Sequence, residues 1–371
     1  PASCARHRSI ADHQSAVIKT GGVRVARSLP ELIDYVFQYL NNPKMDEQGR
    51  KEVREARCFK LDGKSGERLA GVILEHMPVL TKQMQICYLN YDAGGRTGAG
   101  QFCLSLTEAV GKGASARVVW REPGKWKFLF SLRKIRRALQ DCDVVHALDA
   151  WPYGFMAVLA SWGLKKKVII TAVGTGAVKP LYHLWKKVLL KWTYRKANKV
   201  VAVSRNTRRE ILKVMPDLDI EVINHGVDYE KFQNPKSKIQ TSVLAPYILS
   251  VGALKKRKGY EYSTRAFAEI AQKFPDLKYV IVGKGPERES LLTLIRGLKL
   301  EEKVIFFSDV DEDFLLTLYK NAELFILLPQ DINKDIEGFG LVFLEAAAAG
   351  LPVIGTKSSG AEDAVLEGEN G

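Results

Sequence analysis

Short apolar runs alternate with amphipathic stretches through the middle of the chain. Runs rich in β-branched residues predict parallel strands at 85–89, 116–120, 144–146, 167–172 and 199–204. Stretches with helical periodicity separate them, near 101–111, 131–140, 153–162 and 181–197. Such an alternation of strand and helix predicts a doubly wound α/β domain with a parallel sheet.

A second series of the same kind follows a polar break. Asn234-Pro-Lys-Ser-Lys238 interrupts the periodicity and predicts a linker near 233–245. Strands are then predicted near 247–251, 278–282, 303–307, 323–327 and 352–355, and helices near 259–273, 287–298, 312–320 and 340–349. We therefore expect Rossmann-like domains at 83–235 and 236–371, facing a cleft, with ligands at the carboxyl ends of the strands.

The most informative stretch is Glu337-Gly-Phe-Gly-Leu-Val-Phe-Leu-Glu345, which an alanine-rich run follows. A helix that follows a glycine-rich turn has unpaired N–H groups at its N-terminus, and these groups can bind phosphate. Glu345 follows about two turns later, roughly 12 Å along the helix. That spacing suits a molecule with hydroxyls at both ends and a diphosphate between them. The alternative, a buried helix with two incidental glutamates, is disfavoured because charges beside such an apolar run need partners.

This stretch resembles the donor site of the retaining nucleotide-sugar glycosyltransferases of family 4, which have the GT-B fold. Further stretches resemble that family's motifs, in the same order: Asp143-Val-Val-His146, Val203-Ser-Arg-Asn-Thr207, Val222-Ile-Asn-His-Gly-Val-Asp228, Ile248-Leu-Ser-Val-Gly-Ala-Leu254, Lys258-Gly259 and Val280-Ile-Val-Gly-Lys-Gly-Pro286. Each motif is weak alone, but their joint order over about residues 84–371 is specific. The resemblance implies an acceptor-binding first domain and a donor-binding second domain.

The resemblance also implies a role for each charged group. Lys258 is expected to hold the diphosphate, and Arg257 to supply a second cation because the family usually has arginine where this chain has Ala253. Glu345 is expected to accept from the ribose hydroxyls and Glu337 from hydroxyls of the donor sugar, since ionised carboxylates only accept. We take Glu337 and Lys258 as catalytic candidates. A plain solvated loop is the alternative for the basic run.

Backbone N–H groups are expected to complete the donor site. They come from the turn at Gly338, Phe339, Gly340 and Leu341, from Gly283 in a Gly-x-Gly-Pro turn, and from Gly95 and Gly98 in the glycine-rich run after the first strand. Gly95-x-x-Gly98-x-Gly100 has the wrong spacing for a dinucleotide fingerprint, which argues against a dehydrogenase.

His146 ends the third strand and is expected to face the cleft and orient the acceptor, although a lone histidine is more often structural. Val173 stands where the family often has a histidine near the reacting centre, so that role is not carried over. No metal is expected, because each Asp-x-Asp spacing precedes a strand, lies in a connecting loop or begins a helix. No cofactor is expected either, the nucleoside diphosphate sugar being a substrate.

The charge is concentrated in the middle of the chain. Of the net +14, residues 1–82 contribute +4, residues 83–235 contribute +13 and residues 236–371 contribute −3. Near 181–196, Leu181, Leu184, Trp185, Val188 and Trp192 form a stripe that lysines flank. The stripe is typical of a helix at an anionic membrane surface, and a core-packed helix with a basic outer face is the alternative. The five cysteines show no C-x-x-C, so we expect apolar fillers in a reducing compartment.

Residues 1–82 do not continue this pattern. They resemble the C-terminal end of a different GT-B protein, of the CDP-glycerol glycerophosphotransferase type. The chain also ends at Gly371, where the resembled family still needs a strand and several helices. We expect a read-through fragment of a neighbouring transferase, with a permuted arrangement as the alternative, and no catalytic group in this segment.

These observations predict a retaining hexosyltransferase. It would use a nucleoside diphosphate sugar and a hydroxyl of a lipid-linked or polysaccharide acceptor, in the cytoplasm or at the inner face of the plasma membrane. A truncated, non-catalytic nucleotide-sugar-binding relic is one alternative. A nucleic-acid-binding protein is another, suggested by the charge alone, but it leaves the two glutamates unexplained. We therefore expect no nucleic-acid partner.

Overall fold

The computed structural model describes residues 29–42, 84–90, 114–120, 128–233 and 246–365, with a few isolated positions between them. Within this description the chain forms two compact units. The first unit, as we call it, comprises Lys64–Gly226 together with Ile332–Phe339, and the second comprises Pro1–Gly63, Val227–Asp331 and Gly340–Gly371. The short segment 332–339 therefore packs with the first unit, although its neighbours in the chain belong to the second.

The first unit holds a six-stranded sheet in the order β2-β1-β3-β4-β5-β6, parallel at every pair. Its strands are β1 (Met84–Leu89), β2 (Ala114–Trp120), β3 (Val144–Ala147), β4 (Lys167–Ala172), β5 (Lys199–Ala202) and β6 (Glu221–Val222). The five predicted strands are confirmed, while the two-residue β6 was too short to predict. Successive residues of β1 are buried on opposite faces, Cys87 and Leu89 on one and Ile86 and Tyr88 on the other, as expected for a sheet covered on both sides.

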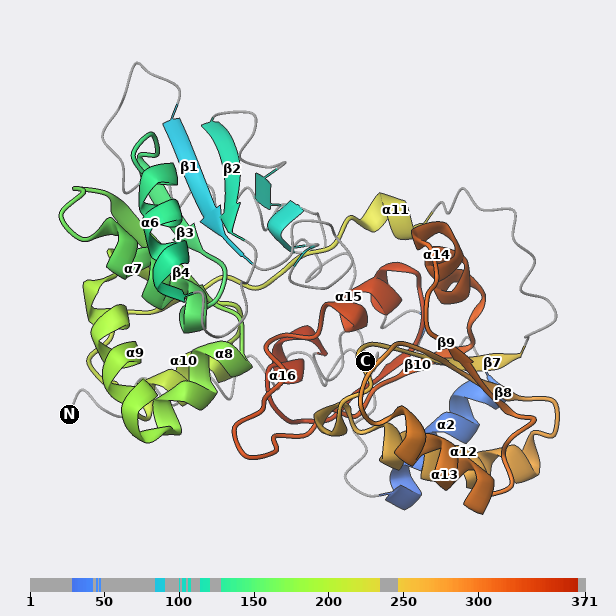
Figure 1. Cartoon of the computed structure of the whole chain (residues 1–371). Coiled ribbons are helices and arrows are strands. Elements are labelled where there is room, and N and C mark those ends of the chain that lie inside the picture. The colour runs from blue at the N-terminus through green and yellow to red at the C-terminus, as the bar shows by residue number, and fades with distance from the viewer. Residues whose placement is uncertain are drawn as a thin grey trace, which may run out of the picture. The chain divides into compact units, whose positions relative to one another are not determined.

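Helices cover this sheet. They are α6 (Phe128–Ala138), α7 (Phe155–Ser161), α8 (Thr175–Val178), α9 (Leu184–Lys196) and α10 (Arg205–Leu212), with short helical turns η2 (Ala150–Gly154) and η3 (Lys179–Tyr182). α7 packs on β3 and β4, and α6 packs on α7 and β2 (Figure 1). Ser204 begins α10, because its hydroxyl accepts from the N–H of Thr207 at 3.0 Å.

The second unit holds a five-stranded parallel sheet in the order β11-β10-β7-β8-β9. The strands are β7 (Tyr247–Val251), β8 (Lys278–Val282), β9 (Val304–Phe307), β10 (Leu324–Ile326) and β11 (Val353–Ile354). The helices are α11 (Tyr229–Gln233), α12 (Tyr260–Lys273), α13 (Arg288–Gly297), α14 (Glu312–Asn321), α15 (Leu341–Ala348) and α16 (Ala361–Ala364), with the turn η4 (Lys256–Lys258). The predicted strands and helices of this series are confirmed to within a residue or two.

One helix from the start of the chain joins the second unit. α2 (Leu29–Asn41) packs on α12, and the rings of Phe37 and Phe274 stack with their centroids 5.3 Å apart (Figure 1). The rest of residues 1–82, apart from a few positions after α2, lies outside the described residues, as does most of the linker predicted at 233–245.

Two cysteines differ from the expectation. Cys87 and Cys142 are joined as a disulfide in the core of the first unit, while Cys103 is a free buried thiol. The prediction that all five are unpaired fillers is wrong for this pair, so the cysteines no longer argue for a reducing compartment. Among the described helices, none combines the length and the apolar character needed to cross a bilayer.

Candidate active site

The order of the second sheet defines where a ligand would bind. The chain passes from β7 to β8 on one side and returns to β10 on the other, so the topological switch lies between β7 and β10. In open parallel sheets, ligands bind at the carboxyl ends of the strands at such a point. The segment that leaves β7 here is Gly252–Gly259, and it contains the predicted cations Arg257 and Lys258.

This segment is held by the loops after β8 and β10. The N–H of Leu254 donates to the carbonyl of Lys284 at 2.8 Å, and the Leu254 carbonyl accepts from the N–H of Glu287 at 3.1 Å. On the other side, the N–H of Gln330 donates to the carbonyl of Arg257 at 2.7 Å. Three strand-end loops are thus tied together through their backbones, which fixes the position of whatever side chains they carry.

Two glycines make this close approach possible. A Cβ atom on Gly283 would lie 1.9 Å from the carbonyl oxygen of Gly252. Gly259 has a φ of +72°, and a Cβ there would lie 1.9 Å from the carbonyl oxygen of Leu328, just after β10. Both positions exclude any side chain. The predicted Lys258-Gly259 and Gly283 motifs therefore have a local structural reason.

Lys258 is buried at the end of η4, although it carries a charge. Its ammonium lies beside the backbone of Gly252, where a Cβ would be 3.6 Å from Nζ. A buried cation needs negative charge nearby. Glu345 supplies part of that charge, and the charge of Lys258 in turn stabilises the Glu345 carboxylate.

Glu345 lies in the second turn of α15 and is half-buried. Its Oε2 accepts from the hydroxyl of Tyr319 at 2.8 Å. Burial raises the pKa of Glu345, while the Tyr319 hydrogen bond and the charges of Lys231 and Lys258 oppose that rise. Lys258, Glu345 and Tyr319 therefore form one cluster in the second unit, and no sequence pattern indicated Tyr319.

α15 begins at Leu341, within one residue of the predicted start, after Gly340 with its φ of +88°. Glu337 lies in the turn before the helix, as predicted. It is buried with the first unit, whereas Glu345 belongs to the second. The estimate of two helical turns between the two carboxylates is therefore wrong.

Thr175 holds the segment of Glu337 in place. Its hydroxyl lies 2.8 Å from Oδ1 of Asp335 and 2.9 Å from the carbonyl of Ile336, and it accepts from the Ile336 N–H at 3.1 Å. One side chain therefore satisfies both backbone groups of the residue before Glu337.

Gly338 and Phe339 extend this contact. A Cβ on Gly338 would lie 1.7 Å from the carbonyl oxygen of Val173, so only glycine fits. Phe339 is buried edge-on to the ring of His225, with the centroids 5.5 Å apart. Val173 contributes its backbone here, so the absence of the family's histidine at this position does not disturb the packing.

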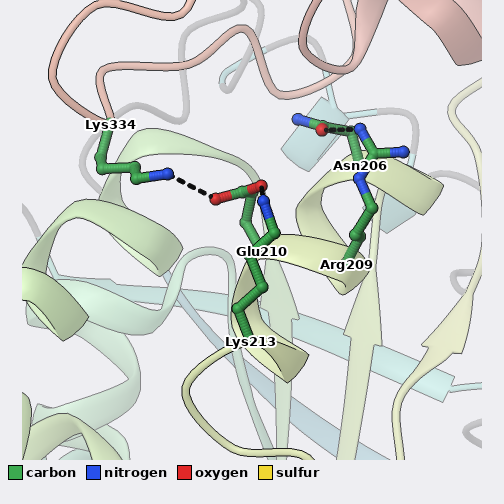
Figure 2. Close-up of polar contacts among 5 residues, drawn as sticks. All are labelled: Asn206, Arg209, Glu210, Lys213 and Lys334. Atoms are coloured by element: carbon green, nitrogen blue, oxygen red, sulfur yellow. Dashed lines mark hydrogen bonds and ion pairs between the residues drawn. The ribbon is translucent and has the colours of Figure 1, made fainter.

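An ion-pair cluster anchors the same segment (Figure 2). Lys334 donates to Oε2 of the buried Glu210 at 2.9 Å, and Lys213 contacts its other oxygen. Burial opposes ionisation of Glu210, but these two lysines outweigh it and lower the pKa of the carboxyl. Arg209 turns to Asn206 instead, at 2.6 Å. Glu210 therefore anchors the segment through Lys334.

His146 lies inside the sheet. It is fully buried on β3, with its ring 5.3 Å from that of Tyr88 and its Nε2 2.8 Å from the hydroxyl of Thr171. Burial lowers the pKa of His146 to about 3, so the ring is neutral. These contacts belong to the core, and a role in orienting an acceptor stays a prediction. Gly95 and Gly98 lie outside the described residues.

Asp149 lies two residues after the end of β3, immediately before η2. Its Oδ1 accepts from the N–H of Ala150 at 2.8 Å, and the N–H of Val173 also donates to this carboxyl. Burial raises the pKa of Asp149 to about 7 despite these two hydrogen bonds. Asp149 thus supports the loop after β4 that meets Gly338. Among the described residues, no group of three or more histidine, cysteine or acidic side chains could hold a metal ion.

Comparison with known proteins agrees with this architecture. Residues 95–231 match the family described as Glycosyltransferase Family 4, and residues 233–371 match the family described as Glycosyl transferases group 1. HepE from Anabaena, solved with UDP and glucose, superposes with a TM-score of 0.61 at 18% identity, over 78% of this chain and 88% of that one. Both domains thus match glycosyltransferase family models, and the chain has the GT-B fold.

Two curated glycosyltransferase relatives show how much of the sequence is shared. The GDP-mannose-dependent alpha-(1-6)-phosphatidylinositol monomannoside mannosyltransferase of Mycolicibacterium smegmatis is 31% identical over 184 residues, which cover 47% of this chain and 48% of that protein. The N-acetyl-alpha-D-glucosaminyl L-malate synthase of Bacillus anthracis is 28% identical over 242 residues, covering 62% and 61%. The chain thus spans about half to three-fifths of the length of these relatives.

A glycine pair tests the packing of the second unit. We expect Gly283→Ala to destabilise the protein by about 2–3 kcal/mol, because its methyl group overlaps the Gly252 carbonyl. The matched control is Gly297→Ala at the end of α13, where nothing lies within 4 Å of the added atom, and it should stay within about 1 kcal/mol of the parent. Urea denaturation measures both. Equal stability of the two variants would contradict the close approach.

Asp149 makes the stability of the folded protein depend on pH. A carboxyl whose folded-state pKa is about 7 stays protonated in the folded protein while the unfolded chain ionises near its ordinary value. Its contribution to the unfolding free energy therefore falls as pH rises from about 4 to about 7, by up to about 4 kcal/mol. Asp149→Asn lacks this ionisation. The free energy of unfolding of the variant, measured with urea, should therefore rise relative to that of the parent as the pH increases across this range. Parallel stability curves would mean that Asp149 ionises alike in both states.

Proposed function

We propose that the protein is a retaining glycosyltransferase that moves a hexose from a nucleoside diphosphate sugar to a hydroxyl of a lipid-linked or polysaccharide acceptor, in the synthesis of cell-surface glycans. The observation that carries the proposal is the cluster of Lys258, Glu345 and Tyr319 at the topological switch of the second sheet. It combines a buried cation, a carboxylate and rigid backbone loops in one place.

Each member of the cluster suits one part of such a donor. The Lys258 ammonium meets the diphosphate, whose negative charge grows as the sugar leaves, and stabilising that charge is the main catalytic task. Glu345 accepts hydrogen bonds from the ribose hydroxyls. The Tyr319 hydrogen bond fixes the orientation of its carboxylate. Because Lys258 is held by short backbone contacts, little reorganisation is needed during the reaction.

Glu337 acts on the sugar in this proposal. Its carboxylate accepts hydrogen bonds from hydroxyls of the hexose, and the N–H groups of Gly338 to Leu341 add donors for phosphate or sugar oxygens. The anchoring of its segment through Thr175 and Lys334 supports a defined position for this carboxylate. The two relatives, a mannosyltransferase and a glucosaminyl L-malate synthase, support glycosyl transfer as the reaction class.

A panel of nucleotide sugars tests the proposal directly. A ligand that binds only the folded state stabilises it by about 2.7 kcal/mol at a hundredfold excess over its Kd. We expect one of the GDP-, UDP-, ADP- or CDP-sugars to raise the melting temperature. If none does while the protein is folded, the donor site is refuted.

Two carboxylate variants separate the two ends of the donor. Glu345→Gln should weaken the binding of the free nucleoside diphosphate by about tenfold or more, because a hydrogen bond to a charged group is lost. Glu337→Gln should leave that affinity unchanged and lower turnover of the complete sugar donor. Calorimetric titration and a product assay give the two measurements. Glu269→Gln, an exposed site on α12, is the matched control; if either variant behaves like it in both assays, the role of that residue is wrong.

A further inference from the structure

The positive charge of this chain is gathered in one stretch of the first unit. Residues 150–209 contain thirteen lysines and arginines and not one aspartate or glutamate. The nearest acidic residues are Asp149 and Glu210, at its two borders, and Glu210 is paired with Lys213 and Lys334. A field of one sign over so long a stretch attracts polyanionic surfaces.

α9 presents apolar side chains to solvent in the middle of that stretch. Leu184 is 92% exposed, Val188 68% and Trp185 55%, whereas Leu190 and Tyr194 on the same helix are buried. Lys187 and Lys191 lie at the same helical face as Leu184 and Val188, one turn apart. The opposite face of α9, with Leu190 and Tyr194, packs against the core of the first unit. The exposed Leu184, Trp185 and Val188 therefore do not contribute to that core.

Aromatic rings extend this surface beyond α9. A row of contacts runs from Trp162 to Trp192 at 5.6 Å, then through Phe155 and Trp151 to Trp185, with successive centroids 5.3–6.1 Å apart. Four of the six tryptophans of the chain belong to this row. The Lys186 ammonium stands 5.7 Å from the Trp151 ring centroid and 5.4 Å from that of Trp185.

We propose that this surface, which we call the α9 face and define by Trp162, Leu184, Trp185, Lys187, Val188 and Lys191, docks on the headgroup region of an anionic phospholipid bilayer. Leu184 and Val188 enter the boundary between headgroups and acyl chains. The tryptophan rings lie at headgroup level, where an apolar body with a polar N–H is favoured. The lysines contact lipid phosphates.

Other occupants fit the α9 face less well. A second copy would place an acid-free, positively charged stretch against its own image, which is repulsive. A nucleic acid would match the charge and stack on tryptophan, but aliphatic Leu184 and Val188 offer it neither stacking nor hydrogen bonds. Scattered single apolar residues are ordinary on any surface, but a contiguous group of this size indicates an interaction site.

Vesicle binding tests the α9 face without reference to the proposed reaction. We expect the parent protein to co-sediment with vesicles of phosphatidylcholine mixed with phosphatidylglycerol, and much less with phosphatidylcholine alone. Salt should weaken the binding. Brominated lipid should quench tryptophan fluorescence, since the rings lie at headgroup level.

Two double variants separate charge from insertion. Lys187→Gln with Lys191→Gln, and Leu184→Ser with Val188→Ser, should each reduce partitioning into the anionic vesicles by at least about tenfold. Lys299→Gln with Lys320→Gln, two exposed lysines of the second unit, should leave it unchanged. The melting temperatures of all variants should match the parent, because none of these side chains is buried in the core.

The proposal is overturned if the parent does not bind the anionic vesicles, or if both α9 variants bind as the parent does. Self-association of the parent that the serine pair abolishes would assign the surface to a second copy instead. Tight RNA binding that only the lysine pair weakens, without vesicle binding, would assign it to nucleic acid. Since these measurements use no donor, their failure is distinct from failure of the proposed function.

Discussion

Backbone hydrogen bonds between strand-end loops are the constraint on which the second unit depends. The links from Leu254 to Lys284 and from Gln330 to Arg257 bring three loops within the distance of a hydrogen bond. Such contacts are possible only where no Cβ intervenes, and Gly259 and Gly283 provide that space. The buried ammonium of Lys258 takes its position from this arrangement, so the chemistry of the site follows from the packing of its main chain.

The segment 332–339 of the first unit is likewise held by contacts to its backbone and by a close approach at a glycine. Thr175 binds both backbone groups of Ile336, and Gly338 lies against the carbonyl of Val173. Lys334 adds an ion pair with the buried Glu210. Asp149, beneath the loop of Val173, extends this network to the end of β3. The segment that carries Glu337 is thus held by residues from three stretches of the first unit, at Asp149, at Val173 to Thr175 and at Glu210.

Local pattern was enough to predict most of the fold, and the reason is visible in particular elements. β7 and β8 are continuous apolar runs because they are buried on both faces, and helices such as α12 show a clear apolar stripe. The strand β6 spans two residues and has no pattern to detect. The expected order of the GT-B motifs agrees with the family comparisons, which match both domains.

The candidate site was predictable only in part, because its decisive contacts are not local. Spacing alone placed Glu337 on the turn and Glu345 in the helix, but the helical rise does not give their separation, because only the residues from Leu341 onward are helical. The partnership of Glu345 with Tyr319 joins residues 26 positions apart, and Thr175 meets Ile336 across 161 positions. No periodicity encodes such pairs. The burial of His146 similarly depends on Tyr88 and Thr171, on neighbouring strands.

The membership of residues 332–339 in the first unit has a consequence for dissecting the molecule. The polypeptide passes between the two units near positions 226, 331 and 339, so cutting the polar linker alone does not yield two self-sufficient pieces. A recombinant first half ending there would leave the hydroxyl of Thr175 and the carboxylate of Glu210 without the partners that this octapeptide supplies. Chimeras that exchange donor halves between homologues would need to move or match these eight residues as a separate insert.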